Sequence, residues 1–390
     1  MNSIQKGKSK KLRIAFLYHA NNVHLLNRAK YFLSQGHTVY YFGFLPEENA
    51  VKTDELKNLI RIHIPRRFIF GKINLLNLLS YVFYIRKLTK KYKLDVLHIQ
   101  NAGFGIFTPF SKAKVTILEN MGSDVILLAD KSILRRLLYR KAYKHVDAVI
   151  QDSFIAKRKG KQWGAPGKNN YVINIGIDLN IFNMSLEQNV ARARLQITPD
   201  QKFIFSPRGM SALYNHDVVI QTLPKVSQKY PDCVYVFTGN YDASNFSEET
   251  KNIINNPKYK KNIYFTGMLD NQTELPFYYR DCDVLISVPS SDSSPLTVYE
   301  AMACGAPVIV SELPWYKGLF IKDQHIRTVP VKDVGALSEQ IELLMEKPGL
   351  LDQKLSFKRV AKRLDYSTEN KRLFCLYSKL VSGKKISEIQ

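Results

Sequence analysis

The chain has 390 residues, of which 45% are apolar and 12% aromatic, enough to fill the cores of two ordinary domains. Its 57 Lys and Arg against 34 Asp and Glu give a net charge of +23, so its surface attracts phosphates or anionic lipid head groups. The four cysteines are far apart and form no C-x-x-C pair, which argues against a disulfide framework and a zinc site and fits a reducing cytoplasm.

Neither a secretion signal nor a membrane span is expected. Residues 1–11 are polar and basic, and the apolar run that follows, 14–18, is too short for a signal sequence. The longest stretches without Lys, Arg, Asp or Glu, 31–46 and 96–111, are 16 residues each, whereas a membrane span needs about 20 apolar residues. We therefore expect a cytoplasmic protein.

The first half of the chain has the pattern of an α/β domain. A buried-strand run at 12–18 is followed by a helical pattern that stops before Gly36, and then by a second strand over 37–42. Gly36 suits a helix end, because that position favours positive φ. Helical stretches separate further predicted strands at 96–99, 115–118, 148–150 and 171–173.

Glycine and turn-forming residues at 174–178 place a domain junction near Gly176. After it strands alternate with helices again, and the tail from Val334 contains three helical stretches. We therefore predict three parts: an N-terminal α/β domain over 1–176, a second α/β domain over 177–370, and a C-terminal helix over 371–390 that packs back on the first domain.

The most informative stretch, 287–310, predicts a strand, a serine-rich loop, a helix and a second strand. Ser294 suits the N-cap of this helix and Pro295 its first position. The amides of Leu296 and Thr297 would then be unpaired at the positive end of the helix. Such a helix end binds phosphate.

Two acids flank this phosphate pocket, with Asp292 before the helix and Glu300 near its second turn. Their D-x7-E spacing, followed by A-M-A-C-G-A-P-V-I-V, resembles the E-x7-E signature of the family 4 retaining glycosyltransferases, the glycosyl transferases group 1. The resemblance implies the GT-B fold, in which two Rossmann-like domains have parallel sheets that face a central cleft. It also implies that Glu300 binds the ribose of a nucleotide-sugar donor, that Asp292 contacts the transferring sugar, and that the residues between them hold the diphosphate.

This chain departs from the family pattern at two places. Asp292 replaces the first Glu, and Ser294-Pro295 stands where Phe-Gly is common. Because Asp is one methylene shorter than Glu, the sugar preference does not carry over. Without the resemblance, Glu300 is an acid that complements a helix dipole, and Asp292 is a solvated loop acid.

Weaker matches to the family occur in the same order. Ser206-Pro207-Arg208-Gly209, after the first strand of the second domain, resembles the family's Arg loop, whose guanidinium holds the donor diphosphate through paired hydrogen bonds. The Lys that commonly follows five residues later is Leu213 here. The alternative is an Arg on a solvated loop.

Two more strands of the second domain end in glycine loops. Gly239-Asn240 follows one strand and Gly267-Met268 the next, where the backbone approaches a ligand or turns sharply. In the family these loops line the nucleotide site. By composition alone each is an ordinary turn.

The first domain supplies candidates for contact with the sugar. Residues 95–100 resemble the family's D-V-x-H-x-H strand, whose last His lies beside the reacting sugar carbon, and that position is Gln100 here. Strand alternation puts Gln100 on the same face as His98, so we expect Gln100 to contact the sugar and keep His98 as a weaker candidate. A lone His98 on a strand is more often a buried, hydrogen-bonded histidine.

The acceptor side has three further candidate positions. Gly122-Ser123-Asp124 resembles the G-S-D loop of many family members, and its alternative is a β-turn with Asx hydrogen bonding. Asn22 and His24 lie at the start of the first helix, where relatives bring the acceptor close.

The resemblance implies retaining transfer from a UDP- or GDP-sugar, without a protein nucleophile and without a metal. No metal motif is visible, and the one D-x-D, Asp281-Cys282-Asp283, precedes a strand instead of ending one. Catalysis then depends on positioning and on charge stabilisation by Arg208 and the helix start at Leu296. Besides the donor, no cofactor is expected.

The acceptor is expected to be a glycan or a lipid-linked molecule of cell-surface polysaccharide or glycolipid synthesis. Residues 66–70 and the apolar run 75–85, with the cations that follow it, predict attraction to an anionic membrane surface. Residues 132–144 add five cations, which spread around a helical wheel. Alternatively, the basic surface serves solubility and steers the nucleotide sugar.

Three other functions have less support. A nucleotide-sugar epimerase shares the fold, but the loss of the second His at Gln100 does not favour it. A nucleic-acid-binding protein is supported by charge alone, because no interleaved aromatic platform is present, and we expect no nucleic-acid partner. A nicotinamide oxidoreductase is disfavoured, since the first turn at 19–22 lacks G-x-G-x-x-G.

Overall fold

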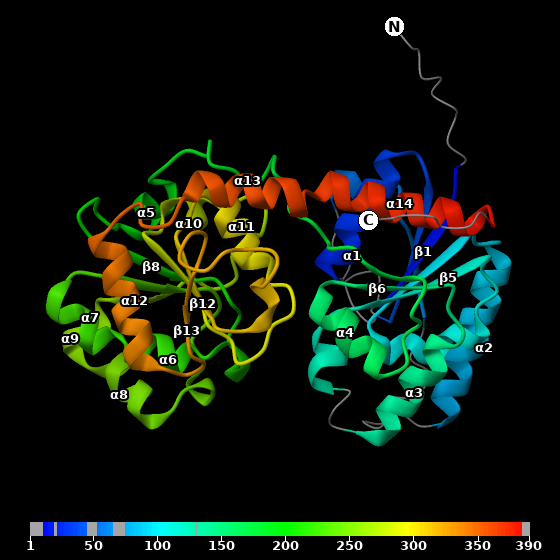
Figure 1. Ribbon diagram of the computed structural model, residues 1–390, viewed down its shortest axis with the longest axis horizontal. Helices are drawn as coiled ribbons and strands as arrows, with labels where there is room; N and C mark the ends of the chain where they lie inside the picture. The colour runs from blue at the N-terminus through cyan, green and yellow to red at the C-terminus, as the bar shows by residue number, and fades with distance from the viewer. Residues whose placement is uncertain (1–10, 19–21, 45–52, 65–74, 129–131, 384–390) are drawn as a thin grey trace, which may run out of the picture. The chain divides into compact units, whose positions relative to one another are not determined.

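A computed structural model describes residues 11–18, 22–44, 53–64, 75–128 and 132–383, and divides the chain into two compact units (Figure 1). The first unit joins Met1–Ile175 with Ser367–Gln390, and the second is Gly176–Tyr366. The chain thus returns to the first unit at residue 367, before the position 371 set from the sequence. The segments 66–70 and 384–390, and most of the turn 19–22, lie outside the described residues.

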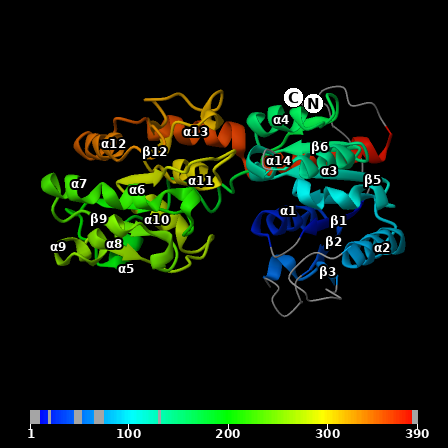
Figure 2. The same ribbon diagram turned by 90° about the horizontal axis from the view of Figure 1, so that it is seen from below.

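The first unit is built on a seven-stranded sheet in the order β3-β2-β1-β4-β5-β6-β7, and every neighbouring pair is parallel. Figure 2 shows α1 and α2 on opposite sides of β1 and β2. Its strands are β1 (Arg13–Tyr18), β2 (Thr38–Gly43), β3 (Ile60–His63), β4 (Val96–Gln100), β5 (Val115–Asn120), β6 (Ala148–Gln151) and β7 (Asn170–Val172). Its helices are α1 (Val23–Ser34), η2 (Asp54–Leu56), α2 (Leu75–Lys91), η3 (Ala102–Phe110), η4 (Asp124–Leu128), α3 (Ile133–Tyr143), α4 (Phe154–Gln162) and α14 (Tyr366–Val381).

The second unit is built on a six-stranded parallel sheet in the order β10-β9-β8-β11-β12-β13. Its strands are β8 (Phe203–Ser206), β9 (Val234–Phe237), β10 (Ile263–Phe265), β11 (Val284–Ser287), β12 (Val308–Ser311) and β13 (Arg327–Val329). Its helices are α5 (Val190–Leu195), η5 (Ala212–Tyr214), α6 (His216–Gln221), α7 (Leu223–Lys229), η6 (Ala243–Asn245), α8 (Glu248–Asn255), α9 (Pro257–Lys260), α10 (Leu275–Asp281), α11 (Leu296–Cys304), η7 (Pro314–Tyr316), α12 (Val334–Glu346) and α13 (Gln353–Leu364).

Both sheets reverse their strand order once, between β1 and β4 in the first unit and between β8 and β11 in the second. The two strands at each reversal are almost wholly buried, as expected of strands covered by helices on both faces. In open parallel sheets, ligands bind beyond the carboxyl ends of the strands at such a reversal. Each unit therefore has one place where a site is expected.

Aromatic contacts attach the last helix, α14, to the first unit. The rings of Tyr377 and Phe32 stack with centroids 5.3 Å apart, and the ring of Phe374 lies 5.0 Å from that of His37. The Glu369 carboxylate accepts a hydrogen bond of 2.6 Å from the amide of Asn174. Helix α14 thus completes the core of a unit whose other residues precede it by some two hundred positions.

Gly176 stands where the chain enters the second unit and is required by a close backbone approach. Its φ is +85°, and a Cβ at this position would lie 2.5 Å from the Cα of Tyr366. The next residue, Ile177, exchanges backbone hydrogen bonds with the returning segment, of 2.7 Å with Leu364 and 3.0 Å with Tyr366. The entering and the leaving segment of this unit are therefore paired.

Within the described ranges, no helix is both long enough and apolar enough to cross a bilayer.

Candidate functional site

Three side chains meet at the strand reversal of the second unit. Arg208 follows β8, its Nη1 donates a hydrogen bond of 3.0 Å to Thr297 Oγ1, and its Nη2 lies 3.0 Å from Asp292 Oδ2. Both members of the Arg208–Asp292 pair are largely buried. The structure thus brings together the Arg loop and the D-x7-E stretch, which lie some ninety residues apart.

The two carboxylate oxygens of Asp292 have different partners. Its Oδ1 accepts a hydrogen bond of 2.8 Å from the Ser293 amide. Its Oδ2 is within ion-pair distance of Arg208, but it is buried and accepts no well-directed hydrogen bond. At this distance the two groups still attract one another, because the attraction between two charges depends on their separation rather than on a hydrogen-bond angle.

His216, a residue that the sequence did not single out, fixes the Arg loop. Its Nε2 donates to the Gly209 carbonyl at 3.2 Å, so its Nδ1 accepts from Ser206 Oγ at 3.3 Å. Burial lowers the pKa of His216, which keeps the ring in this neutral form. The guanidinium of Arg208 also lies over the ring of Tyr214, 4.2 Å from its centroid.

Helix α11 begins at this cluster without a side-chain cap. Pro295 is its N-cap residue and Leu296 its first helical residue, so the predicted helix start, with Ser294 as N-cap and Pro295 as first residue, was one residue too early. The Ser294 hydroxyl instead bonds the Tyr299 hydroxyl at 3.4 Å. The positive end of an uncapped helix attracts anions, and it lies beside Arg208 through Thr297.

Glu300, in the second turn of α11, is buried with one hydrogen-bond donor. That donor is the Tyr279 hydroxyl, 3.1 Å from Glu300 Oε2. Burial raises the pKa of Glu300 to about 7, and the Tyr279 hydrogen bond and the charge of Arg208 oppose this rise. A buried carboxyl group with a pKa near 7 can accept hydrogen bonds from neutral hydroxyl groups at little electrostatic cost.

Gly239 and Gly267 pair with one another beyond β9 and β10. Gly239 donates to the Gly267 carbonyl at 2.7 Å, and both have positive φ, of 104° and 73°. The pairing accounts for both glycines as turn residues. Asn240 and Met268, the latter 81% exposed, then stand on the surface at the carboxyl edge of the sheet.

In the first unit, the two expected sugar contacts are wholly buried. His98 uses both ring nitrogens, Nδ1 toward the Tyr377 hydroxyl and Nε2 toward Glu119 Oε2 at 2.9 Å. Gln100 lies on the same face and donates to Glu119 Oε2 at 3.5 Å, while its Oε1 has no partner. The expectation that His98 and Gln100 touch a sugar does not fit this arrangement, because neither side chain reaches the surface.

Glu119, on β5, is the centre of this buried network. Arg28 donates to Glu119 Oε1 at 2.6 Å, and neither side chain is accessible to solvent. The opposing effects of burial and of these partners sum to a lowered pKa of about 2 for Glu119, so it is ionised. Glu119 and Arg28 were not predicted from the sequence, because their pairing depends on how α1 packs against β5.

The G-S-D loop also has a structural role. The Asp124 carboxylate accepts hydrogen bonds from the amides of Ala102, Met121 and Val125, at 2.7, 3.0 and 3.0 Å. Burial raises the pKa of Asp124 to about 6. Gly122 has φ +80° and Ser123 is the exposed residue of the loop. The Asp124 carboxylate does not bond the amide two residues further on, so the loop is not an Asx turn.

Asn22 is the N-cap of α1. Its Oδ1 accepts from the amides of His24 and Leu25 at 2.9 and 3.1 Å, which accounts for the residue structurally. His24 is half-buried, and burial lowers its pKa to about 4 against the opposing charge of Glu119. His24 is therefore a neutral imidazole near the strand reversal of the first unit.

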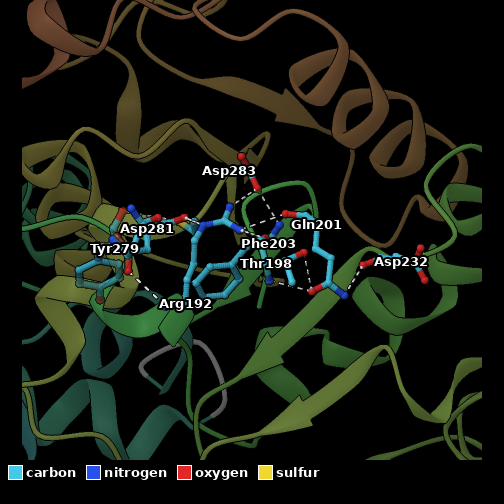
Figure 3. A network of polar contacts seen from close by, with 10 residues as sticks. Arg192, Thr198, Gln201, Phe203, Asp232, Tyr279, Asp281 and Asp283 are labelled. Atoms are coloured by element: carbon cyan, nitrogen blue, oxygen red, sulfur yellow. Dashed lines mark hydrogen bonds and ion pairs between the residues drawn. The ribbon is translucent and has the colours of Figure 1, made fainter. Parts of the chain in front are cut away.

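The D-x-D carboxylates are engaged within the protein (Figure 3). Asp281 accepts from the amides of Asn189 and Ala191, both at 2.7 Å, at the start of α5. Asp283 pairs with Arg192 at 2.7 Å and accepts from the Phe203 amide at 2.7 Å. Across the residues that the structure describes, no group of three or more His, Cys, Asp or Glu is placed to hold a metal ion.

Two family models match the chain, one in each half. Residues 187–363 match the model described as glycosyl transferases group 1, and residues 13–153 match the model described as glycosyl transferase 4-like. The first match contains the Arg loop and the D-x7-E stretch. The second contains β4 and the G-S-D loop.

Curated relatives include a glucosyldiacylglycerol synthase and an O-antigen biosynthesis glycosyltransferase. The alpha-monoglucosyldiacylglycerol synthase of Streptococcus pneumoniae is 24% identical over 288 residues, which are 70% of this chain and 64% of that protein. The O-antigen biosynthesis glycosyltransferase WclY of Escherichia coli is 28% identical over 57% of this chain and 59% of its own length. The chain thus spans somewhat less than two thirds of these relatives.

Solved structures share the fold of the whole chain. The structure of Anabaena Alr3699/HepE with UDP and glucose has a TM-score of 0.76 and 14% identity, covering 94% of this chain and 100% of that one. A glycosyltransferase from Rickettsia africae has a TM-score of 0.78 and 17% identity, over 96% and 100% of the two chains. With two family models that together match most of its length, the chain belongs to the group 1, family 4 type of glycosyltransferases and has the GT-B fold.

Proposed function

We propose that the protein transfers a hexose, with retention of anomeric configuration, from a UDP- or GDP-sugar to a glycan or lipid-linked acceptor. The observation that carries the proposal is the Arg208, Asp292 and Thr297 cluster at the uncapped start of α11, with the buried Glu300 one turn further on. A guanidinium and free helix amides suit a diphosphate. A buried acid with one neutral donor suits ribose hydroxyls.

In the proposed reaction the bond between the sugar C1 and the diphosphate oxygen breaks, and a bond forms from C1 to the acceptor oxygen on the same face. The acceptor proton passes to the departing phosphate oxygen. Arg208 and the start of α11 stabilise the charge that develops on the diphosphate. When the phosphate engages Arg208, Asp292 loses its partner and becomes an acceptor for sugar hydroxyls.

The printed names of the relatives support an acceptor of this class. They include a glucosyldiacylglycerol synthase, an O-antigen glycosyltransferase and a lipopolysaccharide core mannosyltransferase. The structures of HepE with UDP and with UDP-glucose support a UDP-sugar as donor. We further propose that the protein works without a metal, in the cytoplasm, at an anionic membrane surface.

The test is nucleotide release from a panel of UDP- and GDP-sugars, with and without a lipid extract. We expect one donor to be consumed, and NMR of the product to show the anomeric configuration of the donor. Glu300→Gln and Arg208→Lys should each lower kcat/KM roughly 10- to 100-fold, because each removes a charged or bidentate hydrogen bond worth about 1.5–3 kcal/mol.

The control is Glu339→Gln, which changes an exposed acid on α12 and should leave kcat/KM unchanged. Binding of no donor would contradict the proposal. Isomerised donor sugar in the absence of acceptor would establish an epimerase instead.

A further inference from the structure

Helix α3 exposes an unusual amount of apolar surface. The side chains of Ile133, Leu134 and Leu137 are 74%, 66% and 55% exposed. The opposite side of the helix is anchored, since Tyr139 and Tyr143 are buried in the first unit's core. The fold therefore holds this helix rigidly while leaving its apolar residues in contact with water, at a cost of roughly 25 cal/mol for each Å².

The exposed apolar residues continue into exposed cations. Arg140, Lys141 and Lys144 follow on the same helix, and all three are exposed. At 100° a residue, these cations and the three apolar residues fall within an arc of about 120°. Within the described part of the chain, none of the three cations makes an ion pair, and α3 contains no acid.

This arrangement corrects the helical wheel drawn from the sequence, on which five cations spread around the helix. The structure removes Arg136 from that set, because its guanidinium lies 4.5 Å from the ring centroid of Trp163 at the end of α4. Arg135 is also exposed, but it lies outside the arc of about 120°. Within that arc, the first half of the helix is apolar and the second half is basic. We call this surface, Ile133, Leu134, Leu137, Arg140, Lys141 and Lys144, the α3 face.

We propose that the α3 face docks on a lipid bilayer that contains anionic phospholipids, with its apolar residues inserted at the head-group boundary and its cations against the phosphates. The inference rests on the proposed function, in which the acceptor is lipid-linked. Apolar insertion and cationic attraction on one helix face are the two components of interfacial membrane binding. The net charge of +23 adds long-range attraction to such a surface.

A second copy of the chain fits the α3 face less well than a membrane does. Pairing two such helices antiparallel around a two-fold axis through their middle would set the apolar half of each against the cations of the other, and pairing them parallel would oppose cations with cations. Six side chains also cover much less than the roughly 800 Å² that each partner buries in a stable protein interface. A bilayer needs no such area, because its surface is continuous.

The test is cosedimentation of the full chain with phosphatidylcholine vesicles that contain or lack phosphatidylglycerol. The wild type should sediment with the anionic vesicles at low salt and be released at high salt. Ile133→Ser, Leu134→Ser and Leu137→Ser combined should lower the partition coefficient at least tenfold. Arg140→Gln, Lys141→Gln and Lys144→Gln combined should lower it roughly 100-fold and weaken its salt dependence.

Helix α13 provides a matched control. Its Lys354, Lys358 and Lys362 are exposed and spaced by four residues, but α13 itself exposes no large apolar residue. Changing these three to Gln removes the same charge and should alter the partition coefficient less than threefold. An equal loss from both triple variants would show attraction by net charge alone and would overturn docking through α3.

Two further outcomes separate this proposal from the proposed transfer reaction. Nucleotide release with a detergent-dispersed acceptor should be the same in the α3 variants and the wild type. Vesicle binding without any turnover would leave docking standing while the proposed reaction fails. Wild type that stays in the supernatant, or a wild-type dimer that the serine variant dissociates, would overturn the docking proposal.

Discussion

Each unit buries one glutamate close to its strand reversal, and the two are in opposite electrostatic states. Glu119, in the first unit, accepts hydrogen bonds from Arg28 and His98, and its pKa lies near 2. Glu300, in the second, has the Tyr279 hydroxyl as its one donor, and its pKa lies near 7. Burial alone therefore does not distinguish a carboxylate that is paired within the protein from one that can still accept hydrogen bonds from a ligand.

The difference lies in where the nearest arginine points. In the first unit Arg28 points at the glutamate and compensates its charge. In the second, Arg208 pairs with Asp292 and Thr297 and reaches Glu300 through its field rather than through a contact. A carboxylate such as that of Glu119, whose two oxygens both accept from protein donors, stabilises a fold. A carboxylate such as that of Glu300 leaves hydrogen-bonding capacity for a substrate.

The largest effect expected from this comparison is that of Glu119→Gln on stability. The variant leaves Arg28 buried without a counter-charge, so the free energy of unfolding should fall by about 3–5 kcal/mol. Urea denaturation measures this loss. The isosteric Glu300→Gln is the matched variant and should cost less than half as much, so equal losses would remove the distinction between the two acids.

The pH dependence of stability should also differ in sign between the two acids. The raised pKa of Glu300 means that its contribution is complete below about pH 4.5 and is lost as the pH rises toward 7. Relative to Glu300→Gln, the wild type should lose on the order of 1–3 kcal/mol between these limits. Glu119, with its lowered pKa, contributes above about pH 4.5 and loses that contribution as the pH falls toward 2.

Urea denaturation of the wild type and Glu300→Gln at a series of pH values measures how the contribution of Glu300 to stability changes with pH. Parallel curves for the two proteins between pH 4.5 and 7 would show that Glu300 is ionised throughout, like Glu119.

The smallest expected effect is that of Tyr279→Phe, which removes the single donor to Glu300. The free energy of unfolding should fall by about 1 kcal/mol, and the pKa of Glu300 should rise further. Tyr278→Phe is a control, because the neighbouring hydroxyl makes no hydrogen bond within the described residues. If both variants lower the free energy of unfolding equally, the hydrogen bond from Tyr279 to Glu300 makes no measurable contribution to stability.

Sequence alone predicted the parts of the second unit's site that are close together in the chain. The strand, loop, helix and strand over 287–310 are confirmed as β11, α11 and β12, and Gly305 ends the helix at φ +86°. The family's Arg loop gave a reason to expect Arg208 near the start of α11, and the pair that it forms with Asp292 was not predicted. The cap of α11 was misplaced by one residue, because Ser and Pro both suit the start of a helix.

Fewer contacts of the first unit's candidate residues could be predicted from the sequence, because these contacts depend on which residues face one another across neighbouring strands. Strand alternation correctly put His98 and Gln100 on one face, but it could not show that Glu119 of β5 stands opposite them. Nor could it show that Tyr377, from the far end of the chain, covers His98. The roles of single residues in a sheet become visible once their neighbours across the strands are known.

Helix α14 has a consequence for the order in which the protein is made. A ribosome completes the second unit, Gly176–Tyr366, before it synthesises the helix that the first unit needs. Until then Phe32 lacks the ring of Tyr377, and His98 lacks one of its two partners. The half of the protein that is translated first is therefore the last to reach its native state, and it spends that interval with apolar surface open to chaperones.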